Sequence, residues 1–471
     1  MARYFTRRRF IRNVGIGTVG LALAPGVVLK SYGAQDRRTL KLLQWSHFVP
    51  SYDTWFDKHC EAWGKKHNVQ VVVDHISLSD LKSTFAAEVV AGKGHDLVEF
   101  IAPPSDFEPS VHDLSDVHEE ALRRFGTQLP VATESSYNPH TKKFYGFCHG
   151  WTIDPGDYRK SLWAKVGKPD GPRTWEELLT YGARIKQELG VQAGIGLSQE
   201  LDSNMAGRAI LWSFGTGIQD EHENVVLDSK KTIEAVKYMT DLYQKTLTPE
   251  VFSWNPASNN QLLIAGRASY ILNSISAYRS AQQTVPEIAK DIYFSPALKG
   301  PGGIGWASEH VIYVSVIPKF SPNAELAKQF LLDLCANYDQ AMWASKLYNS
   351  PSFFHTKVPG GDRGYPAVTG ARNLRDLFQA WFNRDPFALP GEATDKLKTL
   401  LDAQQWSTNV GHPGPASPAI GEIFGTFVIP NMFAKVAQGR QSAEESVKEA
   451  AAQCRKIFAK WRAQGLVGGK G

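Results

Sequence analysis

Few residues of this chain have the types and spacing that bond chemistry requires. Two carboxylate pairs, Asp53/Asp57 and Asp154/Asp157, could serve as the acid and base of an exported glycoside hydrolase. Both pairs have helical or turn spacing and stand beside basic residues, so surface ion pairing explains them more simply. The chain contains no G-x-x-x-x-G-K-[ST] phosphate loop, no G-x-S-x-G elbow and no H-E-x-x-H zinc pair. We therefore expect no enzyme activity and no cofactor, and we keep the hydrolase as an alternative.

The sequence contains potential metal ligands and four cysteines, but their spacing argues against a metal site. Five potential metal ligands are close together in the sequence: His112, Asp113, Asp116, His118 and Glu119. They alternate irregularly with apolar residues, which is typical of a solvated loop leading into a helix, so we expect no metal site. The cysteines at positions 60, 148, 335 and 454 are too widely spaced for a metal cluster and are expected to be buried. An oxidising compartment leaves a bridge such as Cys60–Cys148 open.

The positive charge of the chain is concentrated at its beginning. The 471 residues carry 52 Lys and Arg against 47 Asp and Glu, a formal net charge of +5. Residues 1–34 hold six of these bases and no acid, so 46 bases remain against 47 acids in the rest. Without a basic body there is no electrostatic footprint for a phosphate backbone, and nucleic acid is not expected as a partner.

The same beginning resembles an export signal. Its basic part is followed by an uncharged stretch at residues 13–29, and small residues follow where a peptidase could cut. The run over residues 6–12 resembles the twin-arginine signal, and the residues that match its motif are Arg7, Arg8 and Phe10. We expect export to the periplasm by the twin-arginine translocase and cleavage near residues 33–34. An uncleaved membrane anchor is the alternative, although the stretch is short for a span and contains Pro25.

The first third of the remaining chain alternates between strand and helix patterns. Strands are predicted at 40–45, 69–73 and 96–101, and helices at 52–66 and 78–91. This alternation predicts right-handed crossovers and a parallel sheet. Ligands bind beyond the carboxyl ends of such strands, so the residues after 45 and after 101 should lie on a functional edge.

The later chain is predicted from caps and glycines. The segment 145–151 is punctuated by glycines and is expected to cross between two lobes, and 300–305 is expected to be a turn. Capping boxes at Thr174/Glu177 and Ser442/Glu445 predict the starts of two helices. The predicted helices are 175–189, 229–244, 323–335 and 443–462, and a strand is predicted at 311–317.

Several of these segments together resemble one family. Tyr145-Gly146-Phe147, then residues 157–167, then Pro-Arg-Thr-Trp-Glu-Glu-Leu at 172–178, resemble the signature Y-G-[IVLF]-P, Y-N-K-x-L-F-x-x-A-G, P-x-T-W-[DE]-E-[LF] of family 1 extracellular solute-binding proteins. Residues 91–98, 263–270 and 321–331 resemble three further motifs in the family's order. The chain departs from the patterns at His95, Cys148 and Arg159.

The resemblance implies the fold and the function. The fold would be the α/β two-lobed periplasmic-binding-protein fold of type II, with a three-segment hinge and a ligand cleft between the lobes. The lobes would comprise 35–149 with 309–345, and 150–308 with a mostly helical 346–471. The protein would be a monomer that closes on a carbohydrate and delivers it to an inner-membrane ABC permease. A polyamine or a phosphodiester such as glycerol phosphate is the alternative ligand.

Ligand-facing residues are expected at strand ends, at crossings and after the glycine-rich turn. Aromatic rings suit a sugar because a pyranose has an apolar face, and neutral polar groups suit its hydroxyls. The candidates are Trp45, Ser46, His47, Trp151, Asp202, Ser203, Asn273, Ser274, Trp306 and Trp406. Each tryptophan could instead pack in the core, and His47 could instead hold a turn through its own hydrogen bonds.

Overall fold

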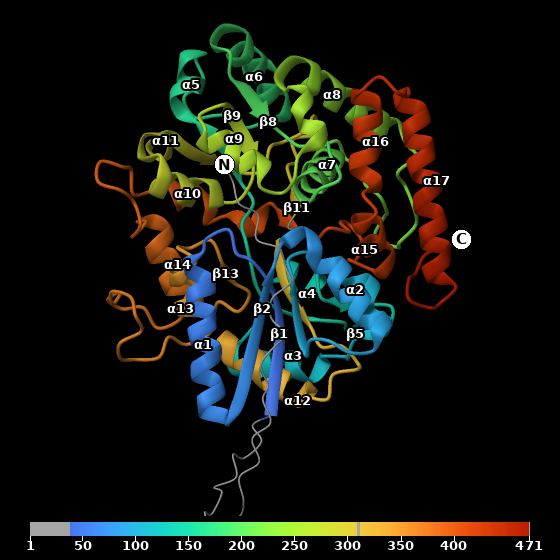
Figure 1. Cartoon of the computed structure of the whole chain (residues 1–471). Helices are drawn as coiled ribbons and strands as arrows, with labels where there is room; N and C mark the ends of the chain where they lie inside the picture. The colour runs from blue at the N-terminus through green and yellow to red at the C-terminus, as the bar shows by residue number, and fades with distance from the viewer. Residues whose placement is uncertain (1–37, 309–310, 471) are drawn as a thin grey trace, which may run out of the picture. The chain divides into compact units, whose positions relative to one another are not determined.

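The computed structural model describes residues 38–308 and 311–470 (Figure 1). The predicted signal residues Arg7, Arg8 and Phe10, and the predicted cleavage region, lie outside the described residues. Among the described residues no single helix is long and apolar enough to cross a membrane.

A six-stranded sheet is the centre of the first half of the structure. Its order is β13-β6-β12-β3-β1-β2. The strands are β1 Arg38–Trp45, β2 Val69–Ile76, β3 Leu97–Phe100, β6 Phe147–Trp151, β12 Ile312–Val316 and β13 Ser350–Pro351. As predicted, β1 is parallel to β2 and to β3. Because β12 is antiparallel to both β3 and β6, the strands β1, β2, β3 and β6 all end at one edge.

The three helices predicted around this sheet are present, and one of them is divided into two parts. The predicted helix at 78–91 is a 3₁₀ turn, Leu78–Asp80, followed by α2, Leu81–Ala91. Helix α1, Ser51–His67, buries Phe56, Cys60 and Trp63 along one side. The other helices here are α3 Ser115–Phe125, α4 Pro130–Glu134, α12 Ala324–Ala336, α13 Tyr338–Ala344 and α14 Leu374–Asn383, with the 3₁₀ helix η2 at Ser105–Ser110.

A four-stranded sheet in the order β10-β7-β9-β8 is the centre of the other half. Its strands are β7 Gly156–Arg159, β8 Gln192–Gly194, β9 Ala268–Leu272 and β10 Ile292–Ser295. Its helices are α5 Lys160–Lys165, α6 Trp175–Leu189, α7 Leu201–Ser213, α8 Lys230–Thr246, α9 Ser258–Ile264, α10 Ser276–Thr284, α11 Pro286–Asp291, α15 Pro418–Gly425, α16 Val428–Ala437 and α17 Ala443–Arg462. The Ser442 hydroxyl and the Glu445 carboxylate form the predicted capping box of α17.

The chain passes between the two sheets three times. It leaves β6 through residues 152–155 to enter β7. It returns through β11, Ala307–Ser308, and passes again through β14, Ser407–Thr408, before α15. The short strands β11 and β14 pair in parallel, so two of the three passages are joined by backbone hydrogen bonds.

The glycine-punctuated segment 145–151 is not itself the crossing, and that prediction is wrong. Residues 147–151 form the buried strand β6, and the crossing begins only after Trp151. The glycines serve close packing within the sheet: a Cβ at Gly150 would overlap the Tyr338 hydroxyl, and one at Gly146 would overlap Val314. Further along, β13 pairs with β6, so the chain is still part of the six-stranded sheet beyond residue 345.

The four cysteines are buried, and so is His118 of the 112–119 segment. Cys60, Cys148, Cys335 and Cys454 are all buried and unpaired. The described residues contain no group of three His, Cys, Asp or Glu side chains placed to hold a metal ion. His118 is buried, with its ring stacked 3.8 Å from that of Phe144.

Candidate functional site

The carboxyl ends of strands from both sheets meet at residues 152–155. Strand β6 ends at Trp151, and β9, antiparallel to β7, ends where β7 begins. The backbone N–H of Asn273 donates to the Pro155 carbonyl at 3.2 Å, so the end of β9 is tied to this crossing. The boundary between the sheets is therefore the edge at which the fold rule places a ligand.

The residues after β1 contribute mainly to the core behind this edge. Trp45 is 1% exposed, and its Nε1 donates to Glu99 Oε1 at 3.2 Å. His47 is also buried: its Nδ1 accepts from the Val49 backbone N–H at 2.9 Å, and its Nε2 donates to Asn349 Oδ1 at 2.9 Å. Burial lowers the pKa of His47 to about 4, so its ring is neutral. Ser46 is exposed.

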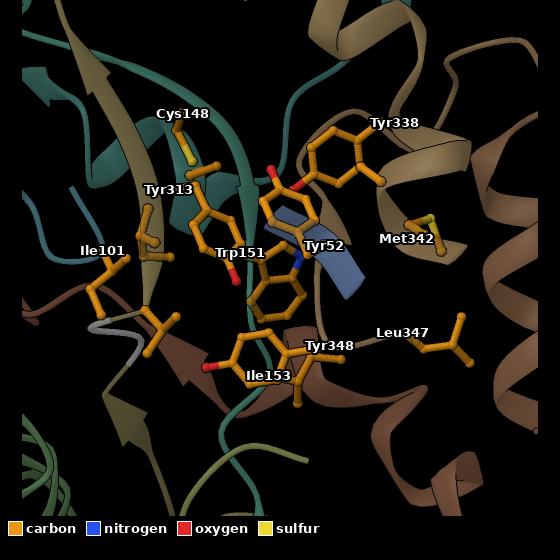
Figure 2. Packing of buried hydrophobic residues seen from close by; sticks show 14 of the residues in the cluster. Tyr52, Ile101, Cys148, Trp151, Ile153, Tyr313, Tyr338, Met342, Leu347 and Tyr348 are labelled. Atoms are coloured by element: carbon orange, nitrogen blue, oxygen red, sulfur yellow. The ribbon is translucent and has the colours of Figure 1, made fainter. Parts of the chain in front are cut away.

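Trp151 lies inside a packed aromatic cluster. Its side chain is 1% exposed. Figure 2 shows its ring among those of Tyr52, Tyr313, Tyr338 and Tyr348, with Ile153 beside it. The indole Nε1 has no hydrogen-bond partner among the described residues. In this conformation Trp151 supports the edge from behind and presents no face to a ligand.

Asp202 and Ser203 belong to a cluster of polar side chains, together with Glu200, at the start of α7. Glu200 caps this helix, and its Oε2 accepts from the Asp202 backbone N–H at 2.6 Å. Burial, and then repulsion by Asp202, raises the pKa of Glu200 to about 8, and burial raises the pKa of Asp202 to about 7. The Ser203 side chain is buried and its hydroxyl donates to Glu200. Both carboxyl groups therefore keep a proton more readily than an exposed carboxylate does.

Tyr348, from the chain just before β13, is affected by the charge of this cluster. Burial raises the pKa of the Tyr348 phenol, and the negative charges of Asp154 and Asp202 raise it further. Asn259 on α9 donates through its Nδ2 to Asp202 Oδ2 at 2.8 Å. Asp154 comes from the crossing, Asp202 from α7 and Tyr348 from the chain just before β13. The sequence gives no local signal for this electrostatic effect.

Asn273 and Ser274 follow β9 as predicted, and both side chains are buried. Asn273 Nδ2 donates to the Ser274 carbonyl at 2.8 Å and to Ser276 Oγ at 3.2 Å. Ser274 lines a narrow crevice, too small for a water molecule, with Ile153 and Tyr348. Both residues thus shape the boundary without lining an open cavity here.

Trp306 separates two open cavities at the passages between the sheets. The first, which we call the Tyr137 cavity, has a volume of about 600 Å³, and its walls include Glu134, Tyr137, Glu221, Trp306, Asn409 and His412. The second, the Arg173 cavity, has a volume of about 510 Å³, and its walls include Arg173, Lys299, Trp306, Asp402 and Trp406. Of the ten predicted residues, only Trp306 and Trp406 line these cavities.

The Tyr137 cavity draws its walls from both halves of the structure. Leu129 and Val131, at α4, pack into the core of the six-stranded sheet. Glu221 follows Ile218, which packs into the core of the four-stranded sheet. Residues 407–415 come from the third passage, β14, and the loop after it. Sequence reasoning missed Glu134, Tyr137, Glu221 and Asn409 because they follow no strand predicted from the sequence and carry no motif.

The two carboxylate pairs have different surroundings. Asp53 accepts from the His47 backbone N–H at 3.0 Å, and Asp57 Oδ1 lies 2.9 Å from His75 Nε2. Asp154 and Asp157 are both buried, so surface pairing is the wrong explanation for them. Asp157 stands in β7 opposite Ile271 and Phe294. Strand β7 lies inside its sheet with Gly156 and Tyr158 buried as well, so the Asp157 side chain has no surface group among the described residues to pair with.

Solved structures share the whole fold at low sequence identity. A maltose-bound MalE3 from T. maritima superposes with a TM-score of 0.70 at 20% identity, covering 89% of this chain and 99% of that one. A sugar transporter component from Arthrobacter chlorophenolicus with bound laminaribiose has a TM-score of 0.70 at 17% identity, with the same coverage. These likenesses confirm the predicted α/β fold of periplasmic solute-binding proteins.

Curated relatives match over a shorter stretch. A binding protein of Brucella abortus is 26% identical over 148 residues, which is 31% of this chain and 36% of the relative. An ABC transporter-binding protein of Deinococcus radiodurans is 25% identical over 162 residues, 39% of its length. The matched part thus spans little more than a third of these relatives.

The sequence profile described as bacterial extracellular solute-binding protein matches residues 58–359. This range begins within α1 and contains every strand of the six-stranded sheet except β1. It also contains the whole four-stranded sheet and two of the three passages. The chain belongs to the family of bacterial extracellular solute-binding proteins.

Proposed function

We propose that this protein captures a carbohydrate between two lobes, built around the six-stranded and the four-stranded sheet, and delivers it to an ABC permease of the inner membrane. It would act as a periplasmic monomer, exported by the twin-arginine translocase and cleaved near residues 33–34. The lobe boundaries would be those expected from the sequence, except that the return segment extends past residue 345 to include β13. The observation that carries the proposal is the Tyr137 cavity, whose walls come from both lobes and from a passage.

The cavity walls offer what a sugar ring needs. Trp306 and Tyr137 provide aromatic surface for the apolar face of a pyranose, and Asn409 provides an amide for hydroxyl groups. Because the walls belong to both lobes, a ligand that contacts them all would favour the closed arrangement over an open one. Of the predicted residues, we propose Trp306 and Trp406 for ligand contact, since Ser46 and Asp202 line neither cavity. We propose that Trp45, His47, Trp151, Ser203, Asn273 and Ser274 support them.

Two alternatives receive less support. A phosphodiester would need an arginine in the Tyr137 cavity, but Arg173 lines only the neighbouring cavity, and Arg279 is buried against Asp385, with Nη1–Oδ2 at 2.7 Å. Arg208 is also buried, and its Nε donates to the Val410 carbonyl at 3.1 Å. The hydrolase considered from the sequence would need Asp154 and Asp157 beside an open cavity, and they line neither cavity described above. We therefore propose that the protein does not turn over the solute that it binds.

The test is a thermal-shift screen of the purified protein against sugars and polyols, followed by calorimetry on the best ligand. A ligand at 100 times its Kd should add about 2.7 kcal/mol to the free energy of unfolding. Trp306→Ala should then weaken binding about 5- to 150-fold, since burying an aromatic face contributes about 1–3 kcal/mol. Its ligand-free melting temperature should change little because Trp306 is half-exposed.

Trp55→Ala is the matched control. Trp55 is also half-buried, but it lies on α1, where its Nε1 donates to Gln340 at 3.4 Å. It lines neither cavity, so its truncation should leave the affinity unchanged. Equal affinity of both variants and the unmodified protein would remove the Tyr137 cavity from the binding site.

A further inference from the structure

The polar walls of the Tyr137 cavity carry negative charge and no fixed positive charge. Glu134 and Glu221 are its two carboxylates, and none of the described residues that line it is Lys or Arg. Asn409 Nδ2 donates to Glu134 Oε2 at 3.1 Å, which holds this carboxylate at the cavity wall. His412, which also lines the cavity, has its pKa lowered to about 4 by burial and is neutral at physiological pH. Such a field attracts a cationic solute and repels an anionic one.

The aromatic walls favour the same sign of charge. Trp306 and Tyr137 both line the cavity, and a ring face attracts a cation through its quadrupole. The Trp306 ring lies 4.7 Å from the His412 ring at an interplanar angle of 46°. The neutral His412 ring therefore packs against the indole without competing for a cation.

The remaining walls indicate that the solute also carries hydroxyl groups. Ser407 is 8% exposed and lines the cavity, and its Oγ has no hydrogen-bond partner among the described residues. A buried hydroxyl without a partner costs stability until something supplies one. Pro130, Pro139, Pro413 and Pro415 also line the cavity. These rings restrict the backbone, so little conformational entropy would be lost on binding.

The neighbouring cavity has the opposite character. Arg173 and Lys299 line the Arg173 cavity together with a single carboxylate, Asp402. A ligand that extended past Trp306 would meet negative walls on one side and mainly positive ones on the other. The charge on the walls would therefore orient an amine towards the Tyr137 cavity.

From these observations we propose that the solute is an amine-bearing carbohydrate, whose ammonium group enters the Tyr137 cavity between Glu134, Glu221 and the faces of Trp306 and Tyr137. This inference rests on the proposed function and narrows its substrate class. The carboxylates provide charge, the rings provide a cation-binding face, and Ser407 and Asn409 meet hydroxyl groups.

The experiment is titration calorimetry with two disaccharides that differ in charge: the β-1,4-linked glucosamine dimer and its N-acetylated counterpart. The amine form should bind about tenfold more tightly at low ionic strength, and the preference should shrink in high salt because the carboxylates are exposed. Glu134→Gln and Glu221→Gln should each weaken amine binding about two- to fivefold, the range for exposed ion pairs, and leave the acetylated form unaffected.

Glu287→Gln is the matched control, since Glu287 is an exposed carboxylate on α11 that lines neither cavity. Equal binding of the two disaccharides, with Glu→Gln variants unchanged and Trp306→Ala impaired, would overturn the charge inference and leave the proposed function intact. Binding of spermidine but of no sugar would overturn both the carbohydrate assignment and this inference. Amine-selective binding that the two Glu→Gln variants do not alter would place the ammonium group elsewhere and overturn the site.

Discussion

At the scale of single residues, the environment of Asp157 is unfavourable for a charged carboxylate. It is 0% exposed, and neither carboxyl oxygen has a hydrogen-bond partner among the described residues. Burial raises its pKa well above the usual value, and the charge of Asp154 raises it further. The folded protein therefore keeps a proton on Asp157 at pH values where the unfolded chain has lost it.

This difference predicts how stability depends on pH. The pKa of Asp157 is higher in the folded state, so stability falls as pH rises from the unfolded pKa, near 3.9, towards the folded pKa. Asp157→Asn has no such proton, and its stability relative to the unmodified protein should increase by up to about 1.4 kcal/mol per pH unit in that window. Urea unfolding at pH 4, 5, 6 and 7 measures the difference.

Asp170→Asn, at an exposed position, is the control and should show no such trend. A stability difference for Asp157→Asn that stays constant from pH 4 to pH 7 would mean that the carboxyl group ionises in the folded protein.

At the scale of elements, strand β6 and helix α13 meet at one close contact. The backbone of Gly150 lies against the Tyr338 ring, and a Cβ there would overlap the hydroxyl. The hydroxyl has no hydrogen-bond partner among the described residues, so it contributes bulk more than bonding. This contact explains why a glycine stands in the middle of a buried strand.

Gly150→Ala should therefore destabilise the protein by about 1–3 kcal/mol, the usual cost of overpacking a core. The double variant Gly150→Ala with Tyr338→Phe should recover part of this loss because the phenylalanine lacks the overlapping oxygen. Denaturant unfolding of the two single variants and the double variant measures the coupling energy. Strictly additive losses would show that the two residues do not touch in solution.

At the scale of the whole molecule, three polar contacts join the two halves on the side of α15. Ser105 Oγ donates to the Ser417 carbonyl at 2.8 Å, and Tyr145 Oη donates to the Ala416 carbonyl at 3.3 Å. Lys82 Nζ donates to the Gly421 carbonyl at 3.3 Å. The donors lie on elements of the six-stranded sheet, while α15 packs into the core of the four-stranded sheet. These contacts favour the arrangement seen here over one with separated lobes.

The double variant Ser105→Ala with Tyr145→Phe should shift the ligand-free protein towards an open arrangement. Each lost hydrogen bond contributes about 0.5–1.5 kcal/mol, so the closed fraction and the apparent affinity should both fall several-fold. Small-angle scattering should show a larger radius of gyration without ligand and the original value at saturating ligand. An unchanged radius in both states would show that these bonds do not hold the lobes together.

Sequence patterns alone predicted much of the architecture, because these patterns act over short distances. The alternation over residues 40–101 predicted β1, α1, β2, α2 and β3, and the Ser442/Glu445 box predicted the start of α17. Caps and apolar periodicity depend on neighbours within a few residues, so they can be read without knowing the fold. The family motifs carried the two-lobed topology beyond this local range.

Tertiary structure alone decided which of the predicted site residues can meet a ligand. Trp45, Trp151 and Trp306 all stood at plausible strand ends or crossings, but the first two are buried behind the edge and only Trp306 faces cavities. The Tyr137 cavity joins residues from α4, from the loop at Glu221 and from the third passage, which are far apart in the sequence. Burial and the meeting of distant segments depend on how whole elements pack, and no local pattern of residue types encodes that packing.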